Sequence, residues 1–137
     1  MTIEDLIISY RDTPLTLSVT DVARALFGGT ICVATFDPHP PQGSGVFDGK
    51  TRLNFVGAND KYGRPWAYAY TSRSEYRKAF PQGRRGIEMR FEGFFPLIVE
   101  KPTFAGILFN AGSAASYLMP RKLFPAAQQA RSKPADV

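Results

Sequence analysis

The sequence predicts an α+β domain in which short helices pack against a mixed β-sheet. Short β-rich segments mix with short amphipathic segments, without the regular strand–helix–strand repetition of a parallel α/β fold. No internal repeat or linker divides the chain. Its 137 residues suit one domain, which we place at residues 1–130, followed by a disordered tail at residues 131–137.

Two helices and a strand are predicted first. Residues 3–10 carry apolar side chains at helical spacing and acids in the first turn, which predicts a helix ending before Pro14. A second helix is expected over residues 20–27, capped by Ser18 or Thr20. Residues 30–36 are β-rich and almost continuously apolar, which predicts a buried strand. The expected inner face of the second helix consists of Val22, Ala25, Leu26 and Phe27.

A long loop and a β-hairpin are expected next. Residues 37–50 contain three prolines and three glycines, which predicts a loop. Strands are expected over residues 51–56 and 64–70, joined by a turn within residues 57–63. A helix follows over residues 72–80. Its start is predicted by the capping-box spacing of Ser72 and Glu75, each of which bonds the other's backbone N–H.

The last third is predicted to alternate strands with turns before a final helix. The expected order is a strand at 87–91, a helix or turn at 93–102, a strand at 104–110 and a turn at 111–113. Residues 114–119 are an edge strand or a connector. A helix over residues 120–130 is expected to be interrupted by Pro125.

Charge and hydropathy exclude several classes of protein. The net charge is +5, but the basic residues are scattered among acids, which indicates a mixed solvated surface and disfavours nucleic-acid binding. No apolar run approaches the roughly 20 residues of a membrane-spanning helix. Acids stand at the N-terminus where a signal peptide carries Lys or Arg, and Cys32 is the single cysteine. We therefore expect a cytoplasmic protein that does not enter a membrane.

Catalytic and metal-binding patterns are weak. The single histidine, His39, lies between prolines in the predicted loop, and Cys32 lies inside an apolar strand, where a thiol is inert core. A serine triad using His39 remains open. With one His, one Cys and no clustered carboxylates, the sequence predicts no metal site. It contains no phosphate-binding loop, so no nucleotide cofactor is expected. We therefore expect no enzyme, metal or cofactor.

Two groups of residues are candidate sites. Asn110, Gly112 and Ser113 follow an apolar strand, where a sheet's carboxyl end binds ligands, although a turn in which Asn110 bonds its own backbone is the favoured interpretation. In the hairpin, aromatic side chains two residues apart share one face. Because Ala67 and Ala69 on the other face are small, a core role is favoured for the aromatic side chains. If the aromatic side chains faced outward instead, they would bind a partner. The candidate partner-binding residues are Arg64, Trp66, Tyr68, Tyr70, Arg73 and Arg77.

Two segments resemble the SseB N-terminal-domain family, the enhanced serine sensitivity proteins. They are RPWAYAYTSRSEYRKAF at residues 64–80 and FAGILFNAGSAASYLM at residues 104–119. Both fit the family's pattern of a hairpin strand entering an aromatic-Thr-Ser turn and a later strand ending in Asn-Pro-Gly-Ser, with Ala111 in place of proline. The resemblance covers about residues 18–130 and implies an α/β domain with a mixed sheet, but no settled activity. The 37–50 loop and the lack of a second domain depart from two-domain members.

The function expected from these observations is a non-catalytic protein-binding module. A small SseB-like protein without catalytic residues would suit an immunity or adaptor protein that engages one larger partner, and its basic charge suits an acidic one. The alternative is a protein that binds a small ligand or nucleic acid, or an enzyme, built on the Asn110–Ser113 turn and the basic, aromatic surface. The partner and the oligomeric state are left open.

Overall fold

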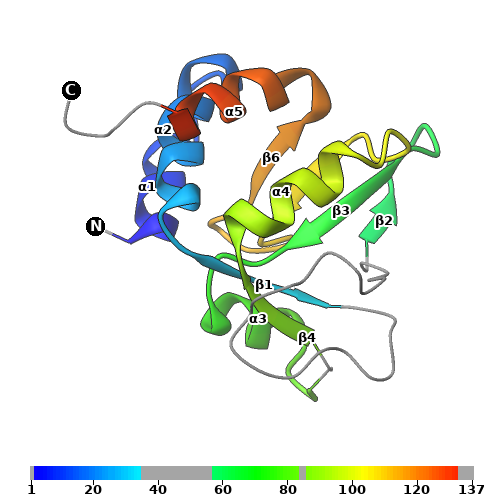
Figure 1. Cartoon of the computed structure of the whole chain (residues 1–137). Helices are drawn as coiled ribbons and strands as arrows, with labels where there is room; N and C mark the ends of the chain where they lie inside the picture. Colours follow the sequence, from blue (N-terminus) through cyan, green and yellow to red (C-terminus); the bar gives the residue numbers. More distant parts are fainter. Residues whose placement is uncertain (1, 35–56, 84–85, 133–137) are drawn as a thin grey trace.

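The computed structural model describes residues 2–34, 57–83 and 86–132, which form an α+β fold (Figure 1). The elements are α1 (Ile3–Ser9), α2 (Leu15–Phe27), β1 (Thr30–Ala34), β2 (Gly57–Asn59), β3 (Pro65–Ala69), α3 (Arg73–Ala79), β4 (Gly86–Arg90), α4 (Phe91–Val99), β5 (Gly106–Phe109), β6 (Tyr117–Pro120), the 3-10 turn η1 (Arg121–Leu123) and α5 (Phe124–Ser132). The predicted fold class is confirmed. The predicted loop at 37–50 and strand at 51–56 lie outside the described residues.

The strands form a mixed four-stranded sheet and a two-stranded sheet. The larger has the order β2-β3-β5-β6, in which β3 and β5 are parallel and the other pairs are antiparallel. The smaller pairs β1 with β4 in antiparallel register. Cys32 and Tyr70 join the two sheets by exchanging backbone hydrogen bonds of 2.8 and 2.9 Å. Since β5 occupies the other edge of β3, β1 and β2 lie one after the other along the same edge.

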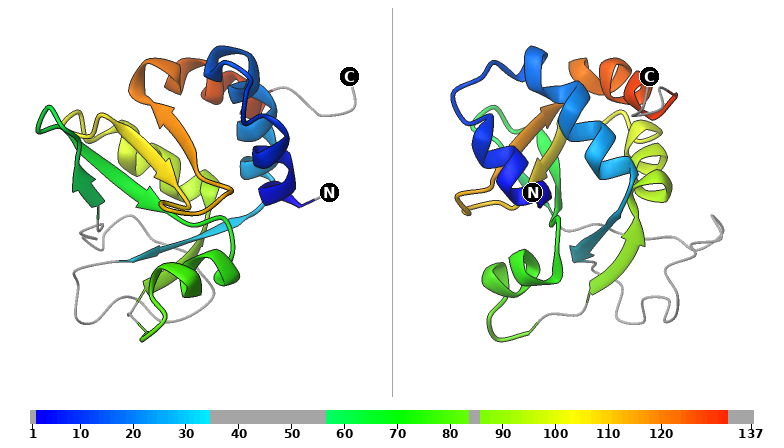
Figure 2. Two further views of the ribbon diagram at one scale, coloured as in Figure 1. Left: turned by 180° about the vertical axis from the view of Figure 1, so that it is seen from behind. Right: turned by 90° about the vertical axis from the view of Figure 1, so that its left-hand side faces the viewer.

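The core lies between the inner face of the larger sheet and helices α2, α4 and α5 (Figure 2). Phenylalanines from three helices and a strand form its centre, with ring centroids 4.8 to 6.0 Å apart. They are Phe27, Phe91, Phe95, Phe109 and Phe124. A buried hydrogen bond of 2.9 Å between Ser18 and the Tyr117 hydroxyl ties α2 to β6. In Figures 1 and 2, α1, α2 and α5 gather on one side and the β2–β3 hairpin lies on the other.

Three helices differ from the prediction. α2 begins at Leu15, directly after Pro14, and therefore contains both Ser18 and Thr20, either of which was expected to cap it. α4 follows β4 without a turn, contains Pro96, and buries the phenylalanines of its first two turns completely. Pro125 is the second residue of α5, where its missing N–H costs nothing, so it does not interrupt the helix. α5 also includes Arg131 and Ser132, which were predicted to belong to the tail.

The inner face of α2 also differs in part from the prediction. Val22, Leu26 and Phe27 are buried as expected, whereas Ala25 is exposed and Ala23 takes its place in the core. Val19 lies one turn before Ala23, so the buried stripe of α2 runs through Val19 and Ala23 at helical spacing, and Ala25 lies outside it. Within the described part of the chain, no helix is both long and apolar enough to cross a bilayer.

Candidate protein-binding face

The side chains of β3 alternate between the two faces of the larger sheet. Ala67 and Ala69 are fully buried on the inner face, whereas Trp66 and Tyr68 point outward and are half-buried. The sequence favoured the opposite arrangement, with the aromatic side chains in the core. The structure differs because the helices fill the inner face with phenylalanines, and small alanines leave room for them.

An apolar strip crosses the outer face of the larger sheet. Tyr68 lies opposite Leu108 on β5, and Leu108 lies opposite Leu118 on β6, so the three side chains form a row. Leu118 is 39% exposed. Trp66 lies against Gly106 of β5, where an added Cβ would come within 2.5 Å of its ring. We call Trp66, Tyr68, Leu108 and Leu118 the outer face.

The Asp60 carboxylate organises the hairpin tip at one end of the outer face. Its Oδ1 accepts the backbone N–H groups of Tyr62 and Arg64 at 2.9 and 3.0 Å. Its Oδ2 accepts the Arg64 Nε–H at 2.9 Å and the Trp66 indole N–H at 3.0 Å. The tip itself closes through a bond from the Gly63 N–H to the Asp60 carbonyl, and Gly63 takes the positive φ of 78° that this turn requires.

These bonds lower the pKa of Asp60 to about 2. The Trp66 indole N–H contributes most, and the bonds from Arg64 and Tyr62 add to it, while partial desolvation acts in the opposite direction. Asp60 is therefore ionised at neutral pH. The ionised carboxylate fixes both the indole of Trp66 and the guanidinium of Arg64 in place.

Helix α3 covers the other end of the outer face. Tyr70 is only 3% exposed, and its ring lies 5.5 Å from Tyr76 and 5.7 Å from Phe80. Arg73 is exposed and forms an ion pair of 2.7 Å with Glu88 of β4, and Arg77 is exposed on the same helix. The structure thus brings Arg64, Trp66 and Tyr68 together on one surface. It buries Tyr70 and places Arg73 and Arg77 on α3.

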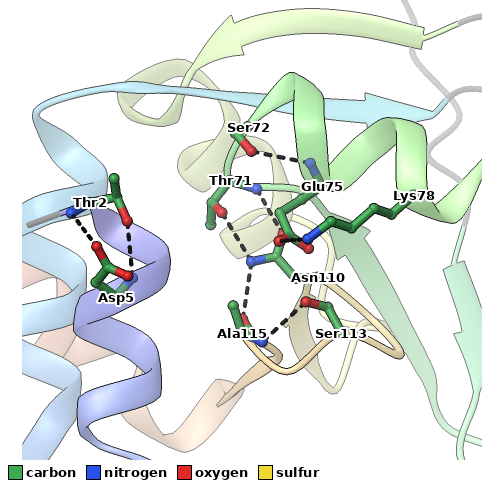
Figure 3. A network of polar contacts seen from close by, with 9 residues as sticks. All are labelled: Thr2, Asp5, Thr71, Ser72, Glu75, Lys78, Asn110, Ser113 and Ala115. Carbon is green, nitrogen blue, oxygen red and sulfur yellow. Dashed lines mark hydrogen bonds and ion pairs between the residues drawn. The ribbon is translucent and has the colours of Figure 1, made fainter.

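The start of α3 has one of the two bonds of the predicted capping box (Figure 3). The Ser72 hydroxyl oxygen accepts the Glu75 N–H at 3.1 Å, as expected. The buried carboxylate of Glu75, however, accepts from Lys78 Nζ at 3.1 Å and does not reach back to the Ser72 N–H. The cause is Lys78 one turn later, which supplies a charged partner at the i,i+3 spacing.

Asn110 joins two turns by hydrogen bonds from its side chain (Figure 3). It is 1% exposed and has a φ of 53°, a left-handed conformation that asparagine tolerates. Its Oδ1 accepts the Thr71 N–H at 2.9 Å, and its Nδ2 donates to Thr71 Oγ1 at 2.9 Å and to the Ala115 carbonyl at 3.0 Å. The turn interpretation expected bonds to the backbone of Asn110 itself, but the side chain instead bonds Thr71 and Ala115, which uses both donor hydrogens of its amide. A ligand would have to break one of these bonds.

The other two candidate ligand-binding residues belong to the same turn. Gly112 has a φ of 81°. The Ser113 N–H donates to the Asn110 carbonyl at 3.0 Å, and the Ser113 hydroxyl oxygen accepts the Ala115 N–H at 3.1 Å. These bonds shape the connection from β5 to β6.

Cys32 lies in β1 with its thiol buried, 3.9 Å from a carboxylate oxygen of Glu88. Burial, assisted by the negative charge of Glu88, raises the pKa of Cys32 to about 11, while Arg73 acts in the opposite direction. The thiol is therefore protonated at neutral pH, as a core residue would be. In the part of the chain that the structure describes, no three His, Cys, Asp or Glu side chains approach closely enough to hold a metal ion. His39 lies outside the described residues.

Three residues of this surface were missed from the sequence. Asp60 stands three residues before Gly63, the spacing of a turn whose first side chain bonds the backbone two residues later. Leu108 and Leu118 follow from alternation along their strands, but only once the register between β5 and β6 is known. The sequence therefore contained enough information to find Asp60, but it could not place the two leucines without the strand register.

Comparison with known proteins identifies one similarity. A family model described as the SseB protein N-terminal domain matches residues 3–123. The match spans every described element from α1 to η1. No curated protein and no solved structure gives a significant match to the chain.

Proposed function

The chain belongs to the SseB protein N-terminal domain family, and on this fold we propose that it acts as a non-catalytic protein-binding module, of the adaptor or immunity type. The contact surface in this proposal is the outer face, with the hairpin tip at its edge. The family assignment names the fold and no activity, so the proposal depends on the surface.

One observation carries the proposal. Trp66, Tyr68, Leu108 and Leu118 lie side by side on three neighbouring strands, on the face of the sheet that the phenylalanine core does not use. Trp and Tyr are enriched at the energetic centres of protein interfaces, and Trp66 and Tyr68 are both partly exposed here. A flat sheet face of this kind suits a macromolecular surface.

Two local environments support a non-catalytic role. Cys32, the single cysteine, is held as a protonated thiol by burial and by the charge of Glu88. Asn110, the most polar residue of the candidate ligand turn, already uses its side-chain oxygen and both amide hydrogens within the protein. Groups that serve the fold in this way need to break their bonds before they can act on a substrate.

The proposal is tested by affinity capture from the native host with two matched variants. Leu118→Glu places a carboxylate on the outer face. Ile8→Glu places the same charge on α1, at a side chain that is 43% exposed compared with 39% for Leu118. Capture at about 0.1 M and about 0.5 M salt separates screened charge from packed contact. We expect one stoichiometric protein to survive high salt with the wild type and Ile8→Glu and to be lost with Leu118→Glu.

The captured protein is then purified and titrated against all three chains by calorimetry. We expect Leu118→Glu to weaken binding at least about tenfold, because a charge would be buried without a partner. Equal binding by Leu118→Glu and Ile8→Glu would contradict a role for the outer face. Retention of nucleic acid alone, lost at high salt, would contradict a protein partner.

A further inference from the structure

We propose that Arg64 is the specificity-determining residue of this surface, and that it binds a carboxylate of the partner protein beside apolar partner side chains that cover Trp66 and Tyr68. This inference rests on the proposed function and adds to it the chemistry of the partner: an acidic residue flanked by aliphatic or aromatic ones.

The Arg64 guanidinium is held in one orientation before any partner arrives. Its Nε–H donates to Asp60 at 2.9 Å, and its Cζ lies 5.3 Å from the centroid of the Tyr62 ring. Asp60 is itself fixed by two backbone N–H groups and by the Trp66 indole. A side chain oriented in this way loses little conformational entropy on binding, which is the main cost of an exposed ion pair.

The binding edge of this guanidinium faces solvent. The side chain is 59% exposed, and among the described residues none accepts a hydrogen bond from Nη1 or Nη2 of Arg64. Two N–H groups in a fixed plane match the two oxygens of a carboxylate. Asp60 occupies the Nε position, so the remaining edge has room for one further carboxylate.

The surroundings favour an acidic protein segment over a nucleic-acid backbone. The tip carries two cations, Lys61 and Arg64, and the ionised Asp60 beside Arg64 offsets one of these charges, so the tip does not present the longer row of cations that successive phosphates require. Next to the guanidinium lies Trp66, and beyond it the row of Tyr68, Leu108 and Leu118. A charged edge adjoining an apolar strip fits an acid with apolar neighbours in a polypeptide.

The test uses a displayed library of random peptides of about 12 residues, selected against the immobilised full chain at about 0.1 M salt. A selected peptide is synthesised with a fluorescent label, together with a copy in which its acids are replaced by the corresponding amides. Binding of both is measured by anisotropy to the wild type, Arg64→Gln, Arg64→Lys, Leu118→Glu and Arg11→Gln. Arg11 is exposed and follows α1, which lies across the molecule from the hairpin. It is therefore the control for loss of one positive charge.

We expect the selected peptides to be enriched in Asp or Glu next to apolar residues. Arg64→Gln should weaken the acidic peptide about tenfold or more, leave the amide copy within about twofold, and be only partly rescued by Arg64→Lys. Arg11→Gln should change binding by less than about twofold. Circular dichroism and melting temperature confirm that each variant is folded.

The outcomes separate the two proposals. The role of Arg64 would be overturned if peptides whose binding is lost in Leu118→Glu carry no excess of acids. It would also be overturned if such peptides bind Arg64→Gln as well as the wild type. In both cases the outer face would remain a binding surface. Peptides that bind Leu118→Glu unchanged, or an oligonucleotide of about 12 nucleotides that displaces them, would overturn both.

Discussion

At the scale of single residues, Asn110 shows how one polar side chain fixes the relation between two turns. Its amide bonds Thr71 after β3 and Ala115 before β6, and all three residues are buried. In Asn110→Ala the Thr71 N–H and the Ala115 carbonyl lose their partners. We expect the free energy of unfolding to fall by about 2–5 kcal/mol, measured by urea denaturation.

A second variant at this position separates hydrogen bonding from backbone conformation. Glycine accepts the φ of 53° without strain, so Asn110→Gly should be about 1 kcal/mol more stable than Asn110→Ala although neither can form the bonds. A loss of less than about 1 kcal/mol in both variants would contradict the structural role. It would revive the interpretation of Asn110 as a ligand-binding residue.

Cys32 provides a prediction about pH at the same scale. Burial, assisted by Glu88, raises the pKa of its thiol to about 11, so the alkylation rate by iodoacetamide should keep rising tenfold per pH unit well beyond pH 9. The urea-unfolded chain should instead level off near the ordinary thiol pKa of about 8.5. Because the folded pKa is raised, the stability linked to this group is present below about pH 8.5 and is lost as pH rises through 11. A native rate that levels off by pH 9 would contradict the assignment.

At the scale of elements, the β2–β3 hairpin depends on the ionised Asp60. The bonds from Trp66, Arg64 and Tyr62 lower its pKa to about 2, so the hairpin is stabilised above the unfolded pKa of about 4 and loses this contribution as pH falls through 2. Trp66 is the single tryptophan and donates its indole N–H to this carboxylate, so the fluorescence of the chain senses the bond directly. We expect a fluorescence transition centred near pH 2 that is missing in Asp60→Asn. A midpoint near pH 4 would mean that the network does not form.

Helix α4 depends on an arginine that lies outside it. The guanidinium of Arg121 in η1 donates to the carbonyls of Ile98, Val99, Lys101 and Phe104, at distances from 2.6 to 3.1 Å. Carbonyls at a helix C-terminus have no partners within the helix, so this side chain takes the place of a cap.

Arg121→Met keeps the aliphatic part of the side chain and removes every donor. We expect it to lower the free energy of unfolding by about 2–4 kcal/mol, measured in urea. Lys122→Met is the control, because Lys122 is a neighbouring exposed cation and should change stability by less than about 0.5 kcal/mol. Equal effects of the two variants would show that the loss of charge, and not the cap, matters.

The sequence predicted elements better than the contacts between them. The 72–80 helix was found from Ser72 and its i+3 glutamate, and the 104–110 strand from its apolar run, because both signals are local. α2 was predicted to start too late, because Ser18 is a good cap by composition but in the fold bonds Tyr117, a residue distant in the sequence. The Arg121 cap could not be predicted because it also joins residues that are distant in the sequence. Arg121 comes close to its four carbonyl partners only after β5 and β6 have paired.

At the scale of the whole molecule, the two faces of the larger sheet differ in burial. The inner face supplies the core, where Ala67 and Ala69 make room for phenylalanines, and the outer face carries side chains that the fold leaves half-buried. Alternation along β3 showed that the aromatic and alanine sides differ. It did not show which side faces the core, because that depends on the side chains that α2, α4 and α5 bring. The outer face is therefore the part of this sheet on which we base the proposal of a partner-binding surface.

Residues 1–130 were predicted to form one domain, and the junction of the two sheets makes this testable. Cys32 and Tyr70 share two backbone bonds between the sheets, and Phe91, directly after β4, packs against Phe109 of the larger sheet. Unfolding either sheet therefore exposes the core of the other. We expect Trp66 fluorescence and circular dichroism at 222 nm to give the same urea midpoint. Trp66 reports on the larger sheet, whereas the signal at 222 nm comes mainly from the helices. A fluorescence transition that precedes the loss of helix would therefore mean that the sheet unfolds separately, and that the chain contains two cooperative units.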